Sequence, residues 1–325
     1  MKSKKEVFCL GHISVDIFVD RLALNNLRLG GCIDSHNLAI QGGGDAANVS
    51  FWLGKLKTVV SMIGIIGDDP AGTFLRNELE SVNVNCQLKI SKQFPTGTIL
   101  IIIEPDGERS FIANQKIHNH IEWNDLSLDK VLNSILFYTS GYNIENPPTK
   151  NTIKRLFRQI KSNHNSTPLT MFNLAAYTTV EKFKEEIIST ILPYTDILVG
   201  NKKEFEALVG ILNQSSVNNL EKQYVFDIGR KILKNNPNLR IVLITDGGNG
   251  CYCLTEDYKN HIPAQPISII DTTGAGDAFC AGFIKGYISG KELEQAVKFG
   301  MFLGEKVCLG YGARYGASEN LEVIF

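Results

Sequence analysis

The sequence predicts an α/β protein with a mostly parallel sheet that helices cover on both faces, and a small β lid beside it. From about residue 125 onward, short apolar strand patterns alternate with helix patterns, which implies right-handed crossovers between parallel strands. These strands end in Gly, Asn or Asp, which is typical of buried parallel strands with ligands bound at their carboxyl ends. Two other β segments, at roughly 13–41 and 97–114, do not fit the alternation and predict a separate small sheet.

The first third of the chain is rich in strand patterns. "EVFCLGHISVDIFV" is a strand-like opening, and "SHNLAI" and "TVVSMIGIIG" read as further strands. "TGTILIIIEPDGERSFIA" predicts a hairpin whose turn is 105–108. Helix patterns begin at about residues 47 and 71. The two kinds of element therefore alternate less regularly here than further along the chain.

The regular part supplies the remaining elements. "SILFYTSG", "PLTMFNL", "DILVG" and "RIVLITDGG" are apolar strands. "PTKNTIKRLFRQIKS", "TVEKFKEEIISTILPYT", "NKKEFEALVG" and "FDIGRKILKNN" have helical spacing. We expect residues 1–12, 42–96 and 115–325 to form the core that binds nucleotide and substrate. Residues 13–41 and 97–114 are expected to form the β-sheet lid over its cleft.

Composition excludes several classes of function. Hydrophobic residues make up 43% of the 325, charged residues 21%, and the net charge is −1, so no global field attracts nucleic acid or an anionic membrane. No apolar run reaches membrane-spanning length and no signal-peptide pattern opens the chain, so a cytoplasmic protein is expected. The seven scattered cysteines and six histidines lack zinc-ligand spacing, so buried reduced thiols are expected.

Three common catalytic patterns are missing from the sequence. It has no G-x-x-x-x-G-K-[ST] P-loop, no H-R-D or D-F-G set of the protein kinases, and no G-x-S-x-G elbow of serine hydrolases. Any phosphate chemistry must therefore use another glycine-rich arrangement.

The stretch "DTTGAGDAF" at 271–279 combines a glycine turn with the start of a helix. Phe279, Phe283 and Tyr287 follow at intervals of four residues, which predicts an apolar stripe on a helix that begins near Gly276. The first amides of such a helix are free and favour an anion. The turn is therefore a candidate phosphate site.

The residues of this turn suggest a catalytic arrangement. Gly274, Ala275 and Gly276 let a phosphoryl group approach the backbone amides closely. Asp277 would then lie within reach of an acceptor hydroxyl and could take its proton during phosphoryl transfer. A capped helix behind a glycine turn explains the same four residues equally well.

Three weaker patterns accompany this turn. "QGGGDAANVSFWLGKL" puts Asp45 and Asn48 on the first turns of a helix, where their side chains can bond the hydroxyls of a small polyol. Its spacing does not fit the dinucleotide fingerprint G-x-G-x-x-G, and a simple helix-start turn is the alternative. Asn201 and Glu204 form N-x-x-E after a strand, where the acid could orient Mg²⁺ through water. "ITDGGNG" at 244–250 suits a nucleotide against the backbone, but also an ordinary turn.

Taken in their order along the chain, these patterns resemble the ribokinase-like (PfkB) carbohydrate kinase family over essentially the full length. "DTTGAGDAFCAGF" is similar to the C-terminal signature of that family, and "GGGDAANVSFWLGKL" followed by "IGIIGDDPAG" resembles the N-terminal one. The resemblance implies a ribokinase-like fold and an ATP-dependent kinase that uses Mg²⁺. Its substrate would be a small sugar or sugar-like molecule.

The resemblance also implies roles for individual residues. Asp277 corresponds to the catalytic base, and the amides of the three preceding residues correspond to the anion hole. The implied nucleotide site comprises Asn201, Thr245, Gly247 and Gly250. The implied substrate site comprises Asp16, Gly44, Asp45 and Asn48. Metal ligands would be Glu204, for Mg²⁺ through water, and Asp271 with Thr273, where several members hold a monovalent cation, usually K⁺.

The lid bears on the substrate and on assembly. "GERSFIANQKIH" at 107–118 lacks the aromatic-aromatic-arginine run of several 2-keto-3-deoxygluconate kinases and fructokinases of the family, which disfavours those substrates. Arg109 and Asn114 are interpreted as exposed hairpin residues, and the alternative is that they reach the cleft from the lid. Phe111 is the only aromatic residue of the hairpin, so a nucleoside kinase ranks below a sugar kinase. A non-catalytic sugar-responsive protein is a third alternative, and a homodimer through the lid is compatible with the family.

Overall fold

The computed structural model describes most of the 325 residues. The described ranges are 6–20, 30–32, 34–35, 37–104, 109–162, 168–210 and 218–318. The predicted hairpin turn at 105–108 and the side chain of Arg109 lie outside what is described.

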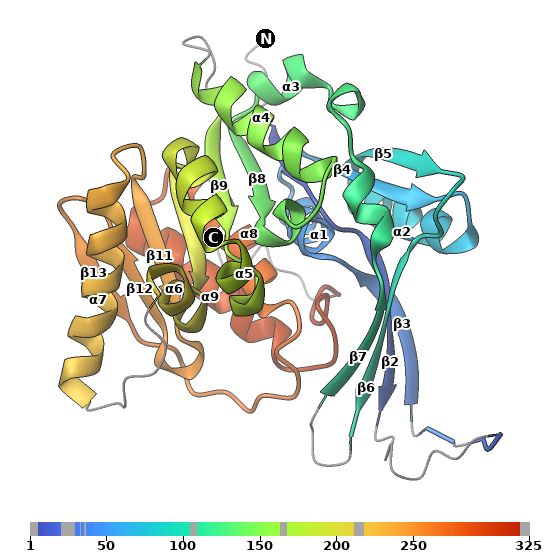
Figure 1. The fold of residues 1–325 in the computed structure, drawn as a ribbon. Helices are drawn as coiled ribbons and strands as arrows, with labels where there is room; N and C mark the ends of the chain where they lie inside the picture. The colour runs from blue at the N-terminus through green and yellow to red at the C-terminus, as the bar shows by residue number, and fades with distance from the viewer. Residues whose placement is uncertain are drawn as a thin grey trace.

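Nine of the described strands form one large sheet (Figure 1). Its middle strands pair in parallel, from β11 through β10, β9, β8, β1 and β4 to β5, while β12 and β13 add an antiparallel edge. In spatial order the strands are β13 (Lys259–Ile262), β12 (Cys251–Leu254), β11 (Ile241–Thr245), β10 (Ile197–Asn201), β9 (Leu169–Asn173), β8 (Leu136–Ser140), β1 (Val7–Leu10), β4 (Val60–Gly67) and β5 (Val84–Ser91).

Helices cover both faces of this sheet (Figure 1). One face packs against α1 (Asp45–Lys55), α2 (Pro70–Ser81), α8 (Ala275–Ile288) and α9 (Leu293–Val307). The other face packs against α4 (Thr149–Ser162), α5 (Tyr177–Thr190), α6 (Lys202–Val209) and α7 (Asn218–Asn235), together with the short α3 (Leu128–Leu132). Short 3-10 helices are η2 (Lys116–His120), η3 (Trp123–Asp125), η4 (Gly141–Ile144), η5 (Leu192–Tyr194) and η6 (Gly247–Asn249).

The strand β1 shows how the sequence serves both layers. Val7 and Cys9 are buried in the core with α1 and α8, whereas Phe8 and Leu10 are buried in the core with α4 and α5. Successive side chains of a strand point to opposite faces, so a run of apolar residues is what a strand between two helical layers requires.

A second sheet of four described strands extends from the core as a separate arm (Figure 1). We refer to it as the lid sheet. Its spatial order is β3 (Asn37–Gly43), β2 (Ser14–Asp20), β6 (Gly97–Ile103) and β7 (Arg109–Asn114). The strands β6 and β7 are antiparallel, with Ile99 opposite Ala113, in agreement with the predicted hairpin. The division of the chain into core and lid at the stated boundaries stays a prediction.

The strand-like opening "EVFCLGHISVDIFV" divides into two strands. It breaks at Gly11–Ile13, so β1 joins the large sheet and β2 joins the lid sheet. Gly11 is required here because a Cβ would lie 2.6 Å from Nδ2 of Asn143 and 2.9 Å from the side chain of Ala46. The strand β5 and the helix α9 were not predicted at all.

The α/β fold with a mostly parallel sheet, predicted from the alternation, is confirmed. In the part of the chain that the structure describes, no helix is long and apolar enough to span a membrane.

Candidate active site

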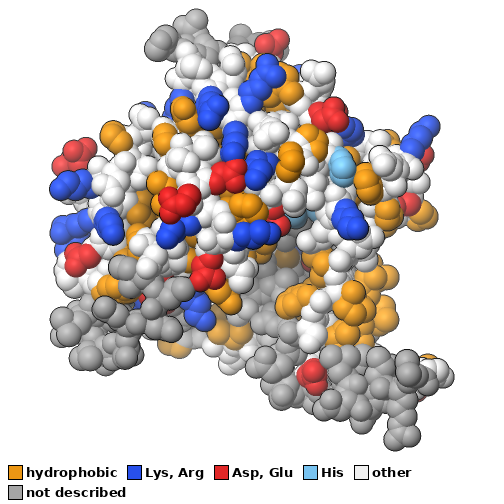
Figure 2. All heavy atoms as spheres, viewed as in Figure 1, with side chains coloured by type: hydrophobic (Ala, Val, Ile, Leu, Met, Phe, Trp, Pro, Cys, Tyr) orange, Lys and Arg blue, Asp and Glu red, His pale blue; other side chains and the backbone are white. Residues whose placement is uncertain are grey.

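A pocket of about 540 Å³ lies between the carboxyl ends of the large-sheet strands and the lid sheet. Figure 2 shows hydrophobic side chains gathered on the lid sheet. The residues that line the pocket come from segments far apart in sequence. They are His12, Gly44, Asp45, Asn48, Ile99, Phe111, Ala113, Gln115, Tyr142, Asn173, Ala175, Val199, Gly200, Asn201, Glu204, Thr245, Thr273, Gly274, Gly276, Asp277 and Phe279.

The two glycines of the turn before α8 have different surroundings. Gly274 caps the helix with φ 74°, and a Cβ there would lie 2.2 Å from the Cβ of Ala313, so the fold itself requires glycine. Gly276 lies inside the first turn of α8, and an added Cβ would have no neighbour within 4 Å. Glycine costs a helix about 1 kcal/mol relative to alanine. Nothing among the described residues explains why residue 276 is a glycine, because there is room for a larger side chain.

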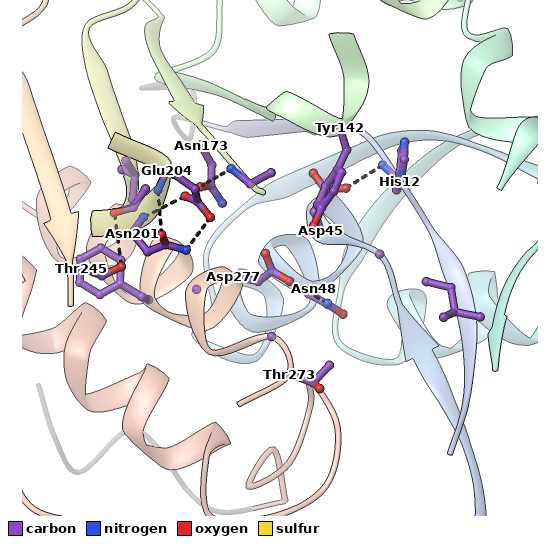
Figure 3. A pocket seen from close by; sticks show the side chains of 18 of the residues that line it. His12, Asp45, Asn48, Tyr142, Asn173, Asn201, Glu204, Thr245, Thr273 and Asp277 are labelled. Carbon is purple, nitrogen blue, oxygen red and sulfur yellow. Dashed lines mark hydrogen bonds between the residues drawn. The ribbon is translucent and has the colours of Figure 1, made fainter. Parts of the chain in front are cut away.

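The side chain of Asp277 faces α1 across the pocket (Figure 3). Its Oδ2 accepts a hydrogen bond of 2.9 Å from Nδ2 of Asn48. The N-cap of α8 is Gly274, which has no side chain, so the interpretation of Asp277 as a plain cap does not hold.

The pKa of Asp277 is raised to about 8. Burial is the main cause, and the nearby carboxylates of Asp45 and Asp16 add to it. The hydrogen bond from Asn48 and the charge of Arg314 act in the opposite direction. A carboxylate with a raised pKa is a better proton acceptor than an exposed one, as a general base requires.

Two residues predicted for substrate binding meet at the start of α1. Gly44 precedes the helix with φ 90°, and a Cβ would lie 2.5 Å from the backbone oxygen of His12. Asp45 accepts a hydrogen bond of 3.1 Å from the backbone nitrogen of His12 through Oδ1 (Figure 3). Its Oδ2 is buried and has no partner. A buried acceptor without a partner is costly, and Asp45 belongs to a residue set that lines the pocket.

Asp16 lies behind the wall of the pocket and does not line it. It is 5% exposed and accepts a hydrogen bond of 3.0 Å from Oγ of Ser14. Burial raises the pKa of Asp16 to about 6, opposed by that hydrogen bond and by Arg314. Any contact with a substrate would need this side chain to become accessible.

Asn201 and Glu204 lie at the opposite end of the pocket, where β10 runs into α6 (Figure 3). They form a capping box: Oδ1 of Asn201 accepts from the Glu204 backbone nitrogen at 3.0 Å, and Oε2 of Glu204 accepts from the Asn201 backbone nitrogen at 2.8 Å. Burial raises the pKa of Glu204 to about 7, opposed by the backbone bond. The pattern N-x-x-E thus starts the helix and also presents a carboxyl group to the pocket.

Of the residues predicted at the end of β11 and beyond it, Thr245 lines the pocket, and Gly247 and Gly250 do not. The fold requires glycine at position 250, because φ is 105° and a Cβ would lie 2.0 Å from the backbone oxygen of Ile262.

The predicted monovalent-cation residues also differ in exposure. Thr273 lines the pocket, whereas Asp271 is 3% exposed. The Asp271 carboxylate accepts from the backbone nitrogen and Oγ1 of Thr273 at 3.0 and 2.7 Å, and from the Gly312 backbone nitrogen at 2.8 Å.

A stack of three aromatic rings was not predicted from the sequence. His12 lies between His118 and Tyr142, with ring centroids 4.2 and 5.8 Å away. Burial lowers the pKa of His12 and lowers that of His118 well below its ordinary value, so both rings are neutral. His12 and Tyr142 line the pocket beside Asp45 (Figure 3).

A positional signal could have identified some of these residues. Tyr142 and Asn173 follow or end the predicted strands β8 and β9, and ligands of parallel sheets bind at such ends. No sequence signal pairs His12 with His118. Asn114, interpreted as exposed, is exposed and does not line the pocket.

Comparison with known proteins identifies the class. Residues 4–320 match the model of the pfkB family carbohydrate kinases, so the chain belongs to that family. An ATP-dependent ribose-1-phosphate kinase from Halopiger xanaduensis is 25% identical over 98% of this chain and 97% of its own. An adenosine kinase from Saccharomyces cerevisiae is 28% identical over 80% of this chain and 75% of its own.

A solved structure agrees with this fold. Ribokinase from Thermotoga maritima superposes with a TM-score of 0.77 at 20% identity, over 95% of each chain. The protein is therefore an ATP-dependent kinase with the ribokinase-like fold. Kinases of this family use ATP, usually with Mg²⁺, and act on small-molecule sugar substrates.

Proposed function

We propose that the protein transfers the γ-phosphoryl group of ATP to a hydroxyl of a small sugar or sugar-like molecule, with Asp277 as the base. Its carboxylate takes the proton of the acceptor hydroxyl while the hydroxyl oxygen attacks the phosphorus and the bond to the leaving ADP breaks. The amides of Gly274, Ala275 and Gly276 form the anion hole for the transferring group. The observation that carries this proposal is the open space above Gly276, next to a carboxylate that does not cap the helix.

The donor end of the pocket suits a nucleotide. Asn201 and Thr245 end the adjacent strands β10 and β11, with Gly247 and Gly250 in the turn beyond, and we assign the nucleotide to this edge. Among the described residues no cluster of three acidic, His or Cys side chains can hold a metal alone. This fits Mg²⁺ bound mainly by phosphate oxygens and water. Glu204 would contact that ion through water, and the ion would neutralise charge on the phosphates.

The acceptor end suits a neutral polyol. Among the described residues that line the pocket there is no Lys or Arg to pair with a phosphate or carboxylate on the acceptor. Oδ2 of Asp45 has no hydrogen-bond partner, and a small rearrangement that uncovers it would let it accept from a hydroxyl beside Asn48 and Gly44. Asp16 would join this set only after a local rearrangement. Closure of the lid sheet would exclude water that competes for the phosphoryl group.

One observation favours a nucleoside as the acceptor. The neutral rings of Tyr142 and His12, with Phe111 and Ile99 of the lid sheet, present flat and apolar surfaces to the pocket. A nucleobase stacks on such surfaces, whereas a simple sugar gains less from them. The sequence ranked the nucleoside lower because only Phe111 was visible in the lid hairpin.

Two further proposals complete the assignment. Asp271 and Thr273 are proposed to bind K⁺.

The outer face of the lid sheet exposes Leu38 (60%), Ile40 (58%) and Ile112 (63%), which supports a homodimer through the lid. Sedimentation of wild type and of a Leu38→Ser/Ile112→Ser variant checks the dimer: loss of the dimer only in the variant supports it, and a monomeric wild type contradicts it.

A coupled ADP-release assay with Mg-ATP, with and without K⁺, tests the function. The acceptors are ribose, fructose, 2-keto-3-deoxygluconate, myo-inositol, fructose 6-phosphate, adenosine, cytidine and pseudouridine. We expect acceptor-dependent ADP release with a neutral sugar, polyol or nucleoside, and faster release with K⁺. Binding of an acceptor without any turnover would instead support a sugar-responsive binding protein.

A further inference from the structure

Arg314 is a buried cation next to the proposed catalytic base, and neither the sequence patterns nor the proposed reaction assign it a role. It belongs to the segment 308–318 after α9 and is 7% exposed. Its Nη1 forms an ion pair with Glu78 of α2, and its guanidinium carbon lies 4.7 Å from the centre of the Phe51 ring. Its Nε donates to Oδ1 of Asn48 at 3.2 Å. The guanidinium thus reaches two different helices at once.

The surroundings are shaped around this guanidinium. A Cβ on Gly42 of β3 would lie 2.1 Å from Nη1 of Arg314, so only glycine lets the side chain pass the root of the lid sheet. The neighbouring Ala313 accepts a hydrogen bond of 2.9 Å from Nε1 of Trp52 through its backbone oxygen. The backbone directly before Arg314 is therefore held by α1.

These contacts fix the orientation of the Asn48 amide. Arginine has only donors, so the oxygen of the amide has to face Arg314. The amide nitrogen is then left to face Oδ2 of Asp277, to which it donates at 2.9 Å. If the amide were reversed, its NH₂ group would meet the guanidinium and its oxygen would meet the carboxylate, and both contacts would be repulsive.

We propose that Arg314 is a positioning residue that holds the Asn48 amide in the orientation in which it donates to Asp277. The inference rests on the proposed function of Asp277 as the base. It extends that function to the C-terminal segment, which supplies a charge but does not line the pocket.

The charge environment of Asp277 explains why such a residue is needed. Several groups on elements packed around Asp277 are acidic or neutral, and Arg314 is the cation that lowers its pKa. The titratable groups around it are Asp45 of α1, Asp16 of β2, Tyr138 of β8, Cys280 of α8, Tyr142 of η4 and Arg314. Without Arg314, a reversed Asn48 amide would accept a hydrogen bond from protonated Asp277. The loss of the Arg314 charge and the reversal of the Asn48 amide would both favour the protonated, neutral form of Asp277.

The test compares three variants, each checked for folding by thermal unfolding. Arg314→Met combined with Glu78→Gln removes both charges, so no buried charge is left without a partner. Arg314→Lys keeps the charge, but its single ammonium cannot span Glu78 and Asn48 as the guanidinium does. Trp52→Phe is the control, because it loosens the same segment at Ala313 and leaves Arg314 intact.

Two readouts are measured on each folded variant: the pKa of the Asp277 carboxyl by carbon-13 NMR, assigned with Asp277→Asn, and kcat/KM against pH. In the double variant we expect the pKa to rise by roughly 0.5–1 unit. The acid limb of kcat/KM should move up equally, which lowers activity below that pKa by about three- to tenfold. In Arg314→Lys both readouts should lie between those of wild type and the double variant. In Trp52→Phe both should match wild type.

An unchanged pKa of Asp277 in the double variant, or an equal shift in Trp52→Phe, would overturn the positioning role. These results are distinct from failure of the base assignment. If Asp277→Asn kept full turnover while the NMR shift still appeared in the Arg314 variants, the contact would stand and the base role would fall.

Discussion

In the half of the pocket formed by α8, α6 and β11, most lining residues belong to short local motifs, such as the turn at Gly274–Asp277 and the capping box of Asn201 and Glu204. In the half formed by α1, η4 and the lid sheet, the lining residues are brought together from distant parts of the chain, such as His12, Tyr142 and Phe111. We assign the first half to the phosphates of ATP, the ligand that the members of a kinase family share, and the second half to the acceptor, which differs between members. On this assignment, local motifs determine the donor chemistry and tertiary contacts determine the choice of acceptor.

The donor half should be sensitive to one added methyl group. Gly276→Ala places a Cβ in open space where we assign the phosphoryl group, so kcat should fall by about 10²-fold, as for loss of an oxyanion-type contact. The melting temperature should stay the same or rise, because alanine is the better helix former. Steady-state kinetics and thermal unfolding are measured together.

Gly274→Ala is the matched variant in the same turn. Its Cβ would clash with Ala313 and its φ is 74°, so this variant should lose stability as well as activity. Near-wild-type kcat in a well-folded Gly276→Ala protein would refute an anion hole at this turn.

The metal role of Glu204 predicts an intermediate effect. Glu204→Gln removes the charge and keeps one oxygen for the Asn201 backbone nitrogen. Its NH₂ group replaces the oxygen that accepts from Nδ2 of Asn201 at 2.6 Å, so the start of α6 is checked by thermal unfolding. The Mg²⁺ concentration for half-maximal activity should rise by roughly tenfold, since one carboxylate in water-mediated contact is lost.

The metal role of Glu204 also predicts how the Mg²⁺ requirement changes with pH. The pKa of Glu204 is about 7 in the ligand-free protein, so its carboxylate forms as pH rises through 7. The Mg²⁺ requirement of wild type should therefore fall between about pH 6 and 8, and in Glu204→Gln this fall should disappear. Glu186→Gln removes a carboxylate paired with Lys150 and Lys154 outside the pocket and serves as the control. Equal Mg²⁺ requirements in wild type and Glu204→Gln would rule out this role.

A substitution in the acceptor half should have a smaller effect, and this effect should be limited to the KM for the acceptor. Tyr142→Ala removes the outer ring of the stack, and KM for a nucleoside acceptor should rise by about tenfold, as for one lost stacking contact. KM for ATP should not change.

The matched control is Phe94→Ala, which breaks a similar ring stack with His120 that does not line the pocket. If Tyr142→Ala changes KM for ATP as much as KM for the acceptor, the two halves are not separate in the way we describe.

The same contrast explains what sequence could predict. The turn at Gly274–Asp277 and the capping box at Asn201 and Glu204 are local, so their spacing was informative. The α/β alternation is also a local periodicity.

The ring stack and the arginine contact depend on tertiary structure. His12 and His118 are 106 residues apart, and Arg314 is 266 residues from Asn48, so no local pattern joins them. The position of the break at Gly11 is hard to predict because "EVFCLGHISVDIFV" has strand propensity on both sides. Only the approach of Asn143 and Ala46 reveals why the chain turns there.

The most direct measurement is turnover of Asp277→Asn on the acceptor that wild type prefers, together with binding of ATP and acceptor to both proteins. The account predicts a loss in kcat of roughly 10²- to 10⁴-fold with binding largely kept, as for removal of a general base. Asparagine can still contact Asn48 but cannot take the proton. Near-wild-type kcat in the variant would contradict the assignment of Asp277 as the base.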